Sequence, residues 1–168
     1  MLRCLVVTLT LLLTATALSA GDWPCFRGPG RDGKSADNKV PLEWGKEKNV
    51  RWRAILPQPG NSSPIVSNGR VFVTCAQDKK GVERSLYCFD RTSGKQQWVN
   101  TVRWERADPT YPDNPYCAST PAADDERVVV WHGSAGLFCY GHDGRQLWRT
   151  DLGRFQHICG YPSSAISH

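Results

Sequence analysis

A stretch of alternating bulky and small residues that leads into a turn occurs twice in this chain. The first copy, SLYCFDRTSGKQQW, covers residues 85–98, and the second copy, LFCYGHDGRQLW, covers residues 137–148. Alternation of this kind predicts a strand, so each copy is interpreted as strand, tight turn, strand. Gly94 and Gly144 stand at the two turns, where glycine adopts a positive φ angle without steric penalty. The repeat therefore predicts two matching hairpins in an all-β chain.

Large aromatic and hydroxyl side chains recur in step with these hairpins. Trp98 and Trp148 each follow the turn glycine by four residues, and Trp52 precedes Trp98 at a similar interval. Three hydroxyl residues are also spaced about fifty residues apart: Ser63, Thr120 and Ser164. A period near fifty residues with about four short strands per unit is typical of β-propeller blades. An ordinary antiparallel β-sandwich with similar hairpins is the alternative fold.

The period divides the chain into units. It predicts one blade over about residues 49–102, a second over about 117–152 and the start of a third over 160–168. Residues 21–48, rich in proline and glycine, are predicted to form an extended lead-in that places three aromatic side chains on the first blade: Trp23, Phe26 and Trp44. Closed propellers usually have four to eight blades. We therefore expect β-propeller blades of four-stranded antiparallel sheets that form an incomplete propeller of about two to three blades.

Local sequence signals predict further elements of the first blade. Asn68-Gly69 between two β-rich runs is a strong hairpin signal. A further strand is predicted over residues 50–55. No stretch of ten or more residues has the period of an amphipathic helix, which supports the all-β assignment.

The N-terminus is predicted to be a signal peptide over residues 1–20. A positive start, an apolar segment from Leu5 to Leu13 and small residues near Ala20 are the three parts of such a leader. The apolar segment is short for a membrane span, which needs about 20 residues. We therefore expect a secreted or periplasmic protein with no stable membrane span after the leader is removed.

The charge of the remaining chain is mildly basic. Without the leader's single arginine, twenty basic side chains face sixteen acidic ones, and the two signs are interspersed. Nucleic-acid binding proteins gather their basic side chains in a patch or stripe. We therefore expect no nucleic-acid partner.

Six cysteines follow the leader, and six cysteines allow fifteen disulfide pairings that sequence alone does not resolve. Cys88 and Cys139 occupy matching places on predicted strands, where buried free thiols are expected. Cys75 and Cys88 could face each other across one hairpin. No C-x-x-C motif is present, which lowers the expectation of a redox or zinc site.

The first hairpin also carries a family resemblance. The run from Asp90 to Trp98, DRTSGKQQW, resembles the repeat motif A-x-D-x-x-T-G-x-x-x-W of PQQ-like (quinoprotein-type) β-propellers, with Ser93 in place of the threonine. The second copy departs from the motif, because its turn is one residue shorter and it has no aspartate at the place of Asp90. The segments over 23–33, 49–66 and 157–167 also resemble the opening of secreted bacterial propellers of this class. In that family the motif's tryptophan docks between neighbouring blades, which implies structural roles for five residues: Trp52, Trp98, Trp148, Gly94 and Gly144.

The resemblance implies two functions from different classes. In the first, the protein is a non-catalytic binding or scaffold module, as is the propeller subunit of outer-membrane protein assembly, and its partners are other extracytoplasmic proteins or the remaining propeller blades. In the second, it is a fragment of a PQQ-dependent dehydrogenase of alcohols or sugars, with Ca²⁺ beside the quinone. The chain has no adjacent cysteine pair and no carboxylate that aligns with the family's calcium or catalytic positions. We therefore predict no catalytic residue and no metal ligand, and expect PQQ with Ca²⁺ only in a complete propeller.

The long connection over residues 103–117 contains three prolines and has no clear period. Long irregular loops are often functional, although a purely structural connection is the alternative. His157 and Tyr161 stand just before a predicted blade start, where neighbouring loops converge. The predicted binding surface consists of six residues: Trp104, Arg106, Asp113, Asn114, His157 and Tyr161.

Overall fold

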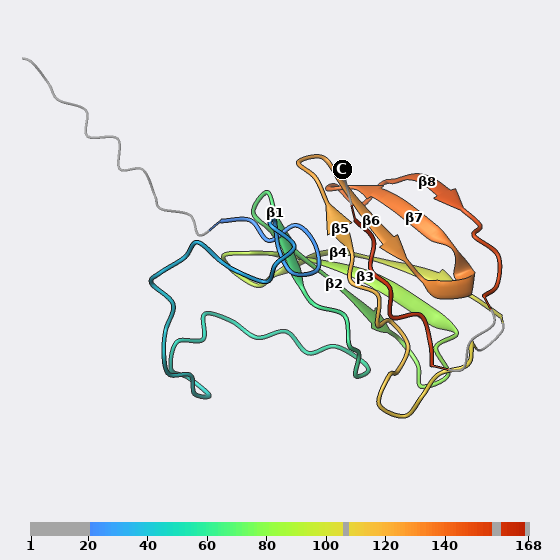
Figure 1. Cartoon of the computed structure of the whole chain (residues 1–168), viewed down its shortest axis with the longest axis horizontal. Coiled ribbons are helices and arrows are strands. Elements are labelled where there is room, and N and C mark those ends of the chain that lie inside the picture. Colours follow the sequence, from blue (N-terminus) through green and yellow to red (C-terminus); the bar gives the residue numbers. More distant parts are fainter. Residues whose placement is uncertain (1–20, 106–107, 156–158, 167–168) are drawn as a thin grey trace, which may run out of the picture.

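A computed structural model of the chain describes residues 21–105, 108–155 and 159–166. These residues form two four-stranded antiparallel sheets that lie against each other (Figure 1). The first sheet consists of β1 (Ile65–Ser67), β2 (Arg70–Ala76), β3 (Glu83–Asp90) and β4 (Gln96–Arg103), in that spatial order. The second repeats the order with β5 (Ala122–Ala123), β6 (Arg127–Trp131), β7 (Leu137–Gly141) and β8 (Gln146–Thr150). One short 3-10 turn, η1 (Gly133–Ala135), interrupts the strands, so the prediction of all-β propeller blades is confirmed.

The two hairpins have the same register. Cys88 of β3 pairs with Trp98 of β4, and Cys139 of β7 pairs with Trp148 of β8. A register shift follows the cysteine in each sheet, which marks a β-bulge at the same place in both. The predicted turn between β1 and β2 also forms, with positive φ angles of 45° at Asn68 and 71° at Gly69.

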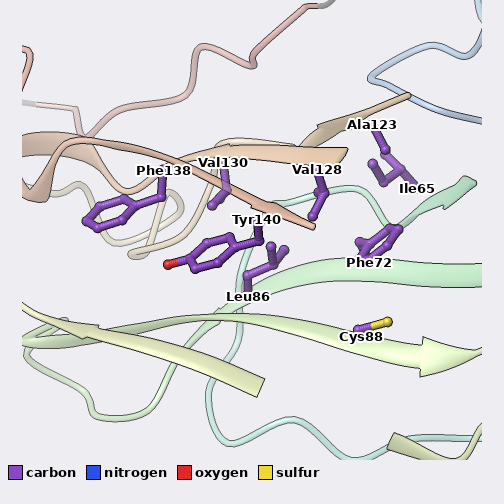
Figure 2. Packing of buried hydrophobic residues seen from close by; sticks show 9 residues of the cluster. All are labelled: Ile65, Phe72, Leu86, Cys88, Ala123, Val128, Val130, Phe138 and Tyr140. Atoms are coloured by element: carbon purple, nitrogen blue, oxygen red, sulfur yellow. The ribbon is translucent and has the colours of Figure 1, made fainter. Parts of the chain in front are cut away.

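The main hydrophobic core lies between the two sheets. Side chains from both sheets point toward one another there (Figure 2). The core contains nine buried residues: Ile65, Phe72, Leu86, Cys88, Ala123, Val128, Val130, Phe138 and Tyr140. Burial of this apolar surface is what holds one blade against the next.

The opposite face of the first sheet is covered by an irregular segment. Trp52 and Leu56 pack there against the buried side chains of Cys75, Tyr87 and Phe89. Residues 50–55 were expected to form a strand, and this prediction is wrong. A strand needs a hydrogen-bonded neighbour, and no described strand lies beside this segment, whose Ile55 is 98% exposed.

The lead-in contacts the sheets at only one end. The backbone N–H and C=O of Trp23 both bond to Val66, at 2.8 and 2.9 Å, and the N–H of Ala123 donates to the Pro24 carbonyl at 2.8 Å. These bonds tie the lead-in to both blades. The expectation that Trp44 packs on the first blade is wrong, because it is 66% exposed within a stretch, residues 29–49, that is exposed throughout. Phe26 is also about half exposed.

The six cysteines of the described chain are all free thiols. Cys88 and Cys139 are buried, as predicted, and burial raises the pKa of the Cys88 thiol to about 12. The suggestion that Cys75 and Cys88 face each other is wrong. Cys75 pairs with Ser85 and Cys88 pairs with Phe72, because the two cysteines are offset along the β2–β3 ladder.

No helix in the described part of the chain has both the length and the apolar character needed to cross a membrane. The predicted leader, residues 1–20, lies outside the described residues.

Candidate binding surface

Trp98 joins the first blade to the second. Its indole N–H donates to the carbonyl of His142 at 2.9 Å, and its ring lies over Gly144 at the tip of the β7–β8 turn. A Cβ atom at Gly144 would come within 2.9 Å of the ring. Gly144 also has a φ angle of +88°, so both the contact and the backbone favour glycine there.

Trp52 makes the equivalent contact one step earlier in the chain. Its indole N–H donates to the carbonyl of Arg91 at 2.9 Å, and its ring covers Gly94, so closely that a Cβ atom would clash. Trp52 therefore caps the β3–β4 turn, and Trp98 caps the equivalent β7–β8 turn of the second sheet. Trp148 is the third in the series, and it is 42% exposed and forms no hydrogen bond through its side chain to another described residue.

The evenly spaced hydroxyl residues form a second chain of contacts between units. The N–H of Ser63 donates to the hydroxyl oxygen of Thr120 at 3.0 Å. The N–H of Thr120 in turn donates to the hydroxyl oxygen of Ser164 at 3.1 Å. The spacing seen in the sequence thus corresponds to a relay of side-chain to backbone bonds from one unit to the next.

A tyrosine after each blade covers a glycine in the loop between that blade's second and third strands. Tyr116 lies over Gly81, and Tyr161 lies over Gly133, where a Cβ atom would come within 2.5 Å of the ring. Both glycines have positive φ angles, +63° and +64°. This pairing was not predicted from the sequence, although a tyrosine two or three residues before each hydroxyl pair was the available signal.

The connection between the blades is fixed at its start by a buried ion pair. Arg84 of β3 and Asp108 lie 2.7 Å apart, and both side chains are at most 3% exposed. Arg84 also donates to the carbonyls of Gly81, at 2.8 Å, and of His132. One arginine therefore holds the connection and both blades together, in a place where loss of either charge leaves the other buried and unpaired.

Two of the predicted surface residues lie at the far end of the connection. The side-chain amide of Asn61 donates to the carbonyl of Asp113 at 2.9 Å and to the side-chain oxygen of Asn114 at 3.2 Å. Asn114 itself donates to the carbonyl of Cys159. The structure thus brings the connection beside the segment that carries Tyr161, as the sequence predicted from converging loops.

Trp104 lies apart from Asn114, on the wall of an open groove of about 500 Å³. Seven residues line this groove: Arg103, Trp104, Glu105, Ser134, Asp151, Gly153 and Arg154. The Ser134 hydroxyl lies 2.6 Å from the Tyr161 hydroxyl, which links the groove to the 159–166 segment. The other two predicted surface residues, Arg106 and His157, lie outside the described residues.

Burial keeps one histidine and one thiol near this surface in their neutral forms. Burial, followed by the neighbouring charge of Arg84, lowers the pKa of His132 to about 3, and burial raises the pKa of the Cys117 thiol to about 12. A neutral histidine and a protonated thiol at pH 7 are respectively a poor acid and a poor nucleophile.

The described residues do not fit a quinone centre with calcium. Calcium takes six to eight oxygen ligands from carboxylates, carbonyls and water. Among residues 21–105, 108–155 and 159–166, no three Asp, Glu, His or Cys side chains lie close enough together to hold a metal ion. No catalytic step is therefore derived through PQQ.

Two sheets of the same strand order, each with its last hairpin turn capped by a tryptophan from earlier in the chain, define a β-propeller repeat protein. Comparison with known families agrees, with matches over residues 42–110 and 82–162. The chain belongs to the family described as outer membrane protein assembly factor BamB. No curated protein matches the chain.

Proposed function

We propose that this protein is a non-catalytic scaffold outside the cytoplasm that binds another polypeptide during outer-membrane protein assembly. The family supports a role in such assembly. The observation that carries the binding role is the groove beside Trp104, which combines an aromatic wall with charges of both signs. Tryptophan and arginine are the residue types that most often dominate protein interfaces.

The groove fits a polypeptide better than a small metabolite. It is open to solvent on one side, and two basic residues, Arg103 and Arg154, flank it together with two acidic ones, Glu105 and Asp151. Small-molecule sites enclose most of their ligand in a mostly apolar cavity. The expected partner is therefore a segment with an apolar side chain for the Trp104 wall and charges of both signs at its edges.

Hydrogen bonds of the described backbone beside the groove support the same role. The N–H of Trp104 donates to the carbonyl of Val82 at 2.8 Å, which continues the β3–β4 ladder to the edge of the groove. Across the groove, Ser134 lies in a loop held by Arg84 and Asp108. A preformed surface loses little conformational entropy when a partner binds.

Site-specific photo-crosslinking in the source organism tests the proposal. A photoreactive amino acid in place of Glu105, on the groove, is expected to crosslink a component of the outer-membrane assembly apparatus. The same amino acid in place of Lys95, an exposed residue at the far turn of the same sheet, is the matched control. Adding Trp104→Ala to the protein that carries the photoreactive amino acid at position 105 should reduce the yield of the crosslink several-fold.

Two results would contradict the proposal. Crosslinking of equal yield from positions 105 and 95, or none from either, would exclude the groove as the contact surface. Dye-linked alcohol oxidation by the full chain with added PQQ and Ca²⁺ would contradict the non-catalytic part. Location is tested separately by fusing a reporter that is active only outside the cytoplasm after residue 168, where an inactive fusion would contradict export.

A further inference from the structure

A second cavity, smaller than the groove, lies where the connection meets both blades. Its volume is about 20 Å³. Its wall comes from Arg84 of the first blade, Trp131 and His132 of the second, Asp108 of the connection, and Ser119, which follows the connection by two residues. It is thus the place where the three parts that support the proposed binding surface meet.

Five of the residues that line this cavity carry buried polar groups that make no hydrogen bond with any described residue. Five residues contribute such atoms: Arg84 through Nη2, Asp108 through Oδ1, Ser119 through Oγ, Trp131 through Nε1, and His132 through both ring nitrogens. Arg84, Asp108, Ser119 and His132 are each at least 97% buried. Buried polar groups in native proteins are nearly always satisfied, because each unpaired one has lost its hydrogen bonds to water without replacement.

Two of the unpaired atoms belong to the buried ion pair. Arg84 and Asp108, which both line the cavity, use Nη1 and Oδ2 for their ion pair, which leaves Nη2 and Oδ1 without a hydrogen bond to any described residue. The N–H groups of Arg84 and Trp131 are donors, the Asp108 oxygen is an acceptor, and the neutral His132 ring offers one of each. The cavity therefore presents donors and acceptors together.

We propose that this cavity holds one permanently bound water molecule that bridges the two blades and the connection. A cavity needs about 10–15 Å³ to accept a water, which also needs two to four polar partners. The volume admits one such molecule. A water accepts two hydrogen bonds and donates two, so it can accept from Arg84 and Trp131 and donate to Asp108 and Ser119 or His132.

Charge distinguishes water from an ion at this place. Arg84 and Asp108 neutralise each other, so the cavity wall attracts neither sign strongly. An anion would lie against the free Asp108 oxygen, and a cation against the free Arg84 nitrogen. Burying a charge that lacks a dedicated counter-charge is strongly unfavourable, whereas a neutral water carries no such penalty.

The water explains how the connection is held in register with the second blade. Asp108 accepts a long bond from the N–H of Ser134, at 3.4 Å, and Ser134 lines the groove beside Trp104. A water between Asp108, Trp131 and His132 adds a second link across the same gap. The bound water is thereby part of the support beneath the groove.

Water–protein NMR on the full chain tests the proposal. The readout is the cross-peak between water and the indole N–H proton of Trp131, whose NOE and ROE signs distinguish a water that tumbles with the protein from a proton exchanging with solvent. A water-derived cross-peak is expected in the unmodified protein. Its absence from the folded protein would overturn the proposal.

Three variants separate the bound water from other sources of signal. Ser119→Ala removes a hydroxyl whose exchange could imitate the cross-peak, and should retain it. Ser119→Val fills the cavity with two methyl groups, and should abolish it. Ser67→Ala is the control, because the Ser67 hydroxyl donates to the Asp124 carbonyl at 2.8 Å, away from the cavity, and should leave the cross-peak unchanged. A cross-peak that survives Ser119→Val or disappears in Ser119→Ala would also overturn the proposal.

Discussion

Strands β4 and β8 occupy the same place in their sheets, but only β4 is covered. Along β4, Trp98, Asn100 and Val102 are partly buried, and the residues between them are exposed. Every residue of β8 is exposed, including Trp148. The difference follows from the neighbour, because the second sheet packs on β4 and no described element packs in the same way on β8.

This comparison shows that the hairpin supplies the tryptophan and the next blade supplies its environment. From the second blade, Trp98 finds the carbonyl of His142, the glycine at position 144 and the ring of Tyr140, whose centre lies 6.3 Å from that of the indole. The side-chain amide of Asn100 adds a bond to the Gly144 carbonyl at 2.7 Å. Trp148 lies at the same register position without these partners. Comparing Trp98 with Trp148 therefore shows what contact with the next blade contributes.

The largest difference should appear when the two tryptophans are truncated. Trp98→Ala is expected to lower the free energy of unfolding by about 3–5 kcal/mol, because it removes a large aromatic side chain from a packed interface. Chemical denaturation followed by circular dichroism measures this loss. A loss below about 1 kcal/mol would place Trp98 outside the interior and remove the basis of the comparison.

A substitution at the acceptor turn should give the next largest effect. Gly144→Ala is expected to destabilise the protein by about 2–4 kcal/mol, because a methyl group meets the Trp98 ring on a backbone that already disfavours it. Gly69→Ala is the matched control, with a φ angle of +71° and open space around its Cβ position. Its expected cost is about 1–2 kcal/mol, from backbone strain alone. Equal losses in the two variants would show that the Trp98 contact adds nothing.

The buried histidine after β6, His132, predicts that the free energy of unfolding depends on pH. The pKa of His132 in the folded protein is about 3, below its unfolded value near 6.5. Between these values the unfolded chain binds a proton that the folded protein does not, so stability falls as the pH falls. From pH 7 to pH 5 this amounts to about 2 kcal/mol.

Comparison of the unmodified protein with His132→Gln isolates this effect. The variant should lose about 2 kcal/mol less between pH 7 and pH 5, as measured by urea denaturation at each pH. His142, whose pKa is also lowered by burial, is present in both proteins and cancels in the difference. Parallel pH profiles would mean that His132 is solvated in the folded state.

The smallest effect is expected on the uncovered side. Trp148→Ala should change the free energy of unfolding by less than about 1 kcal/mol, because the side chain already contacts solvent and has no hydrogen-bonded partner among the described residues. The same denaturation measurement applies. A loss as large as that of Trp98→Ala would show that another part of the protein covers β8.

Much of the fold could be predicted from local sequence signals. The alternation over residues 85–98 and 137–148, the turn glycines and Asn68-Gly69 each act through local backbone geometry, and each hairpin forms where it was expected. The strand expected over 50–55 failed because a strand also requires a partner, which local sequence does not reveal.

The arrangement of the proposed binding surface could be predicted only in part from the sequence. Loop length and convergence pointed to Asn114 and Tyr161, which the structure brings to neighbouring segments. The buried pair of Arg84 and Asp108 was missed, because these residues are 24 positions apart and neither carries a local motif. Pairings of this kind depend on how one blade packs against the next.

Hydrogen exchange of the indole N–H groups of Trp98 and Trp148, followed by NMR, tests the central claim most directly. We predict slow exchange for Trp98, whose N–H is bonded to the His142 carbonyl, and fast exchange for Trp148, which is solvent-exposed. Equal exchange rates for the two indoles would contradict the account, because they would show that the second blade does not receive the tryptophan of the first.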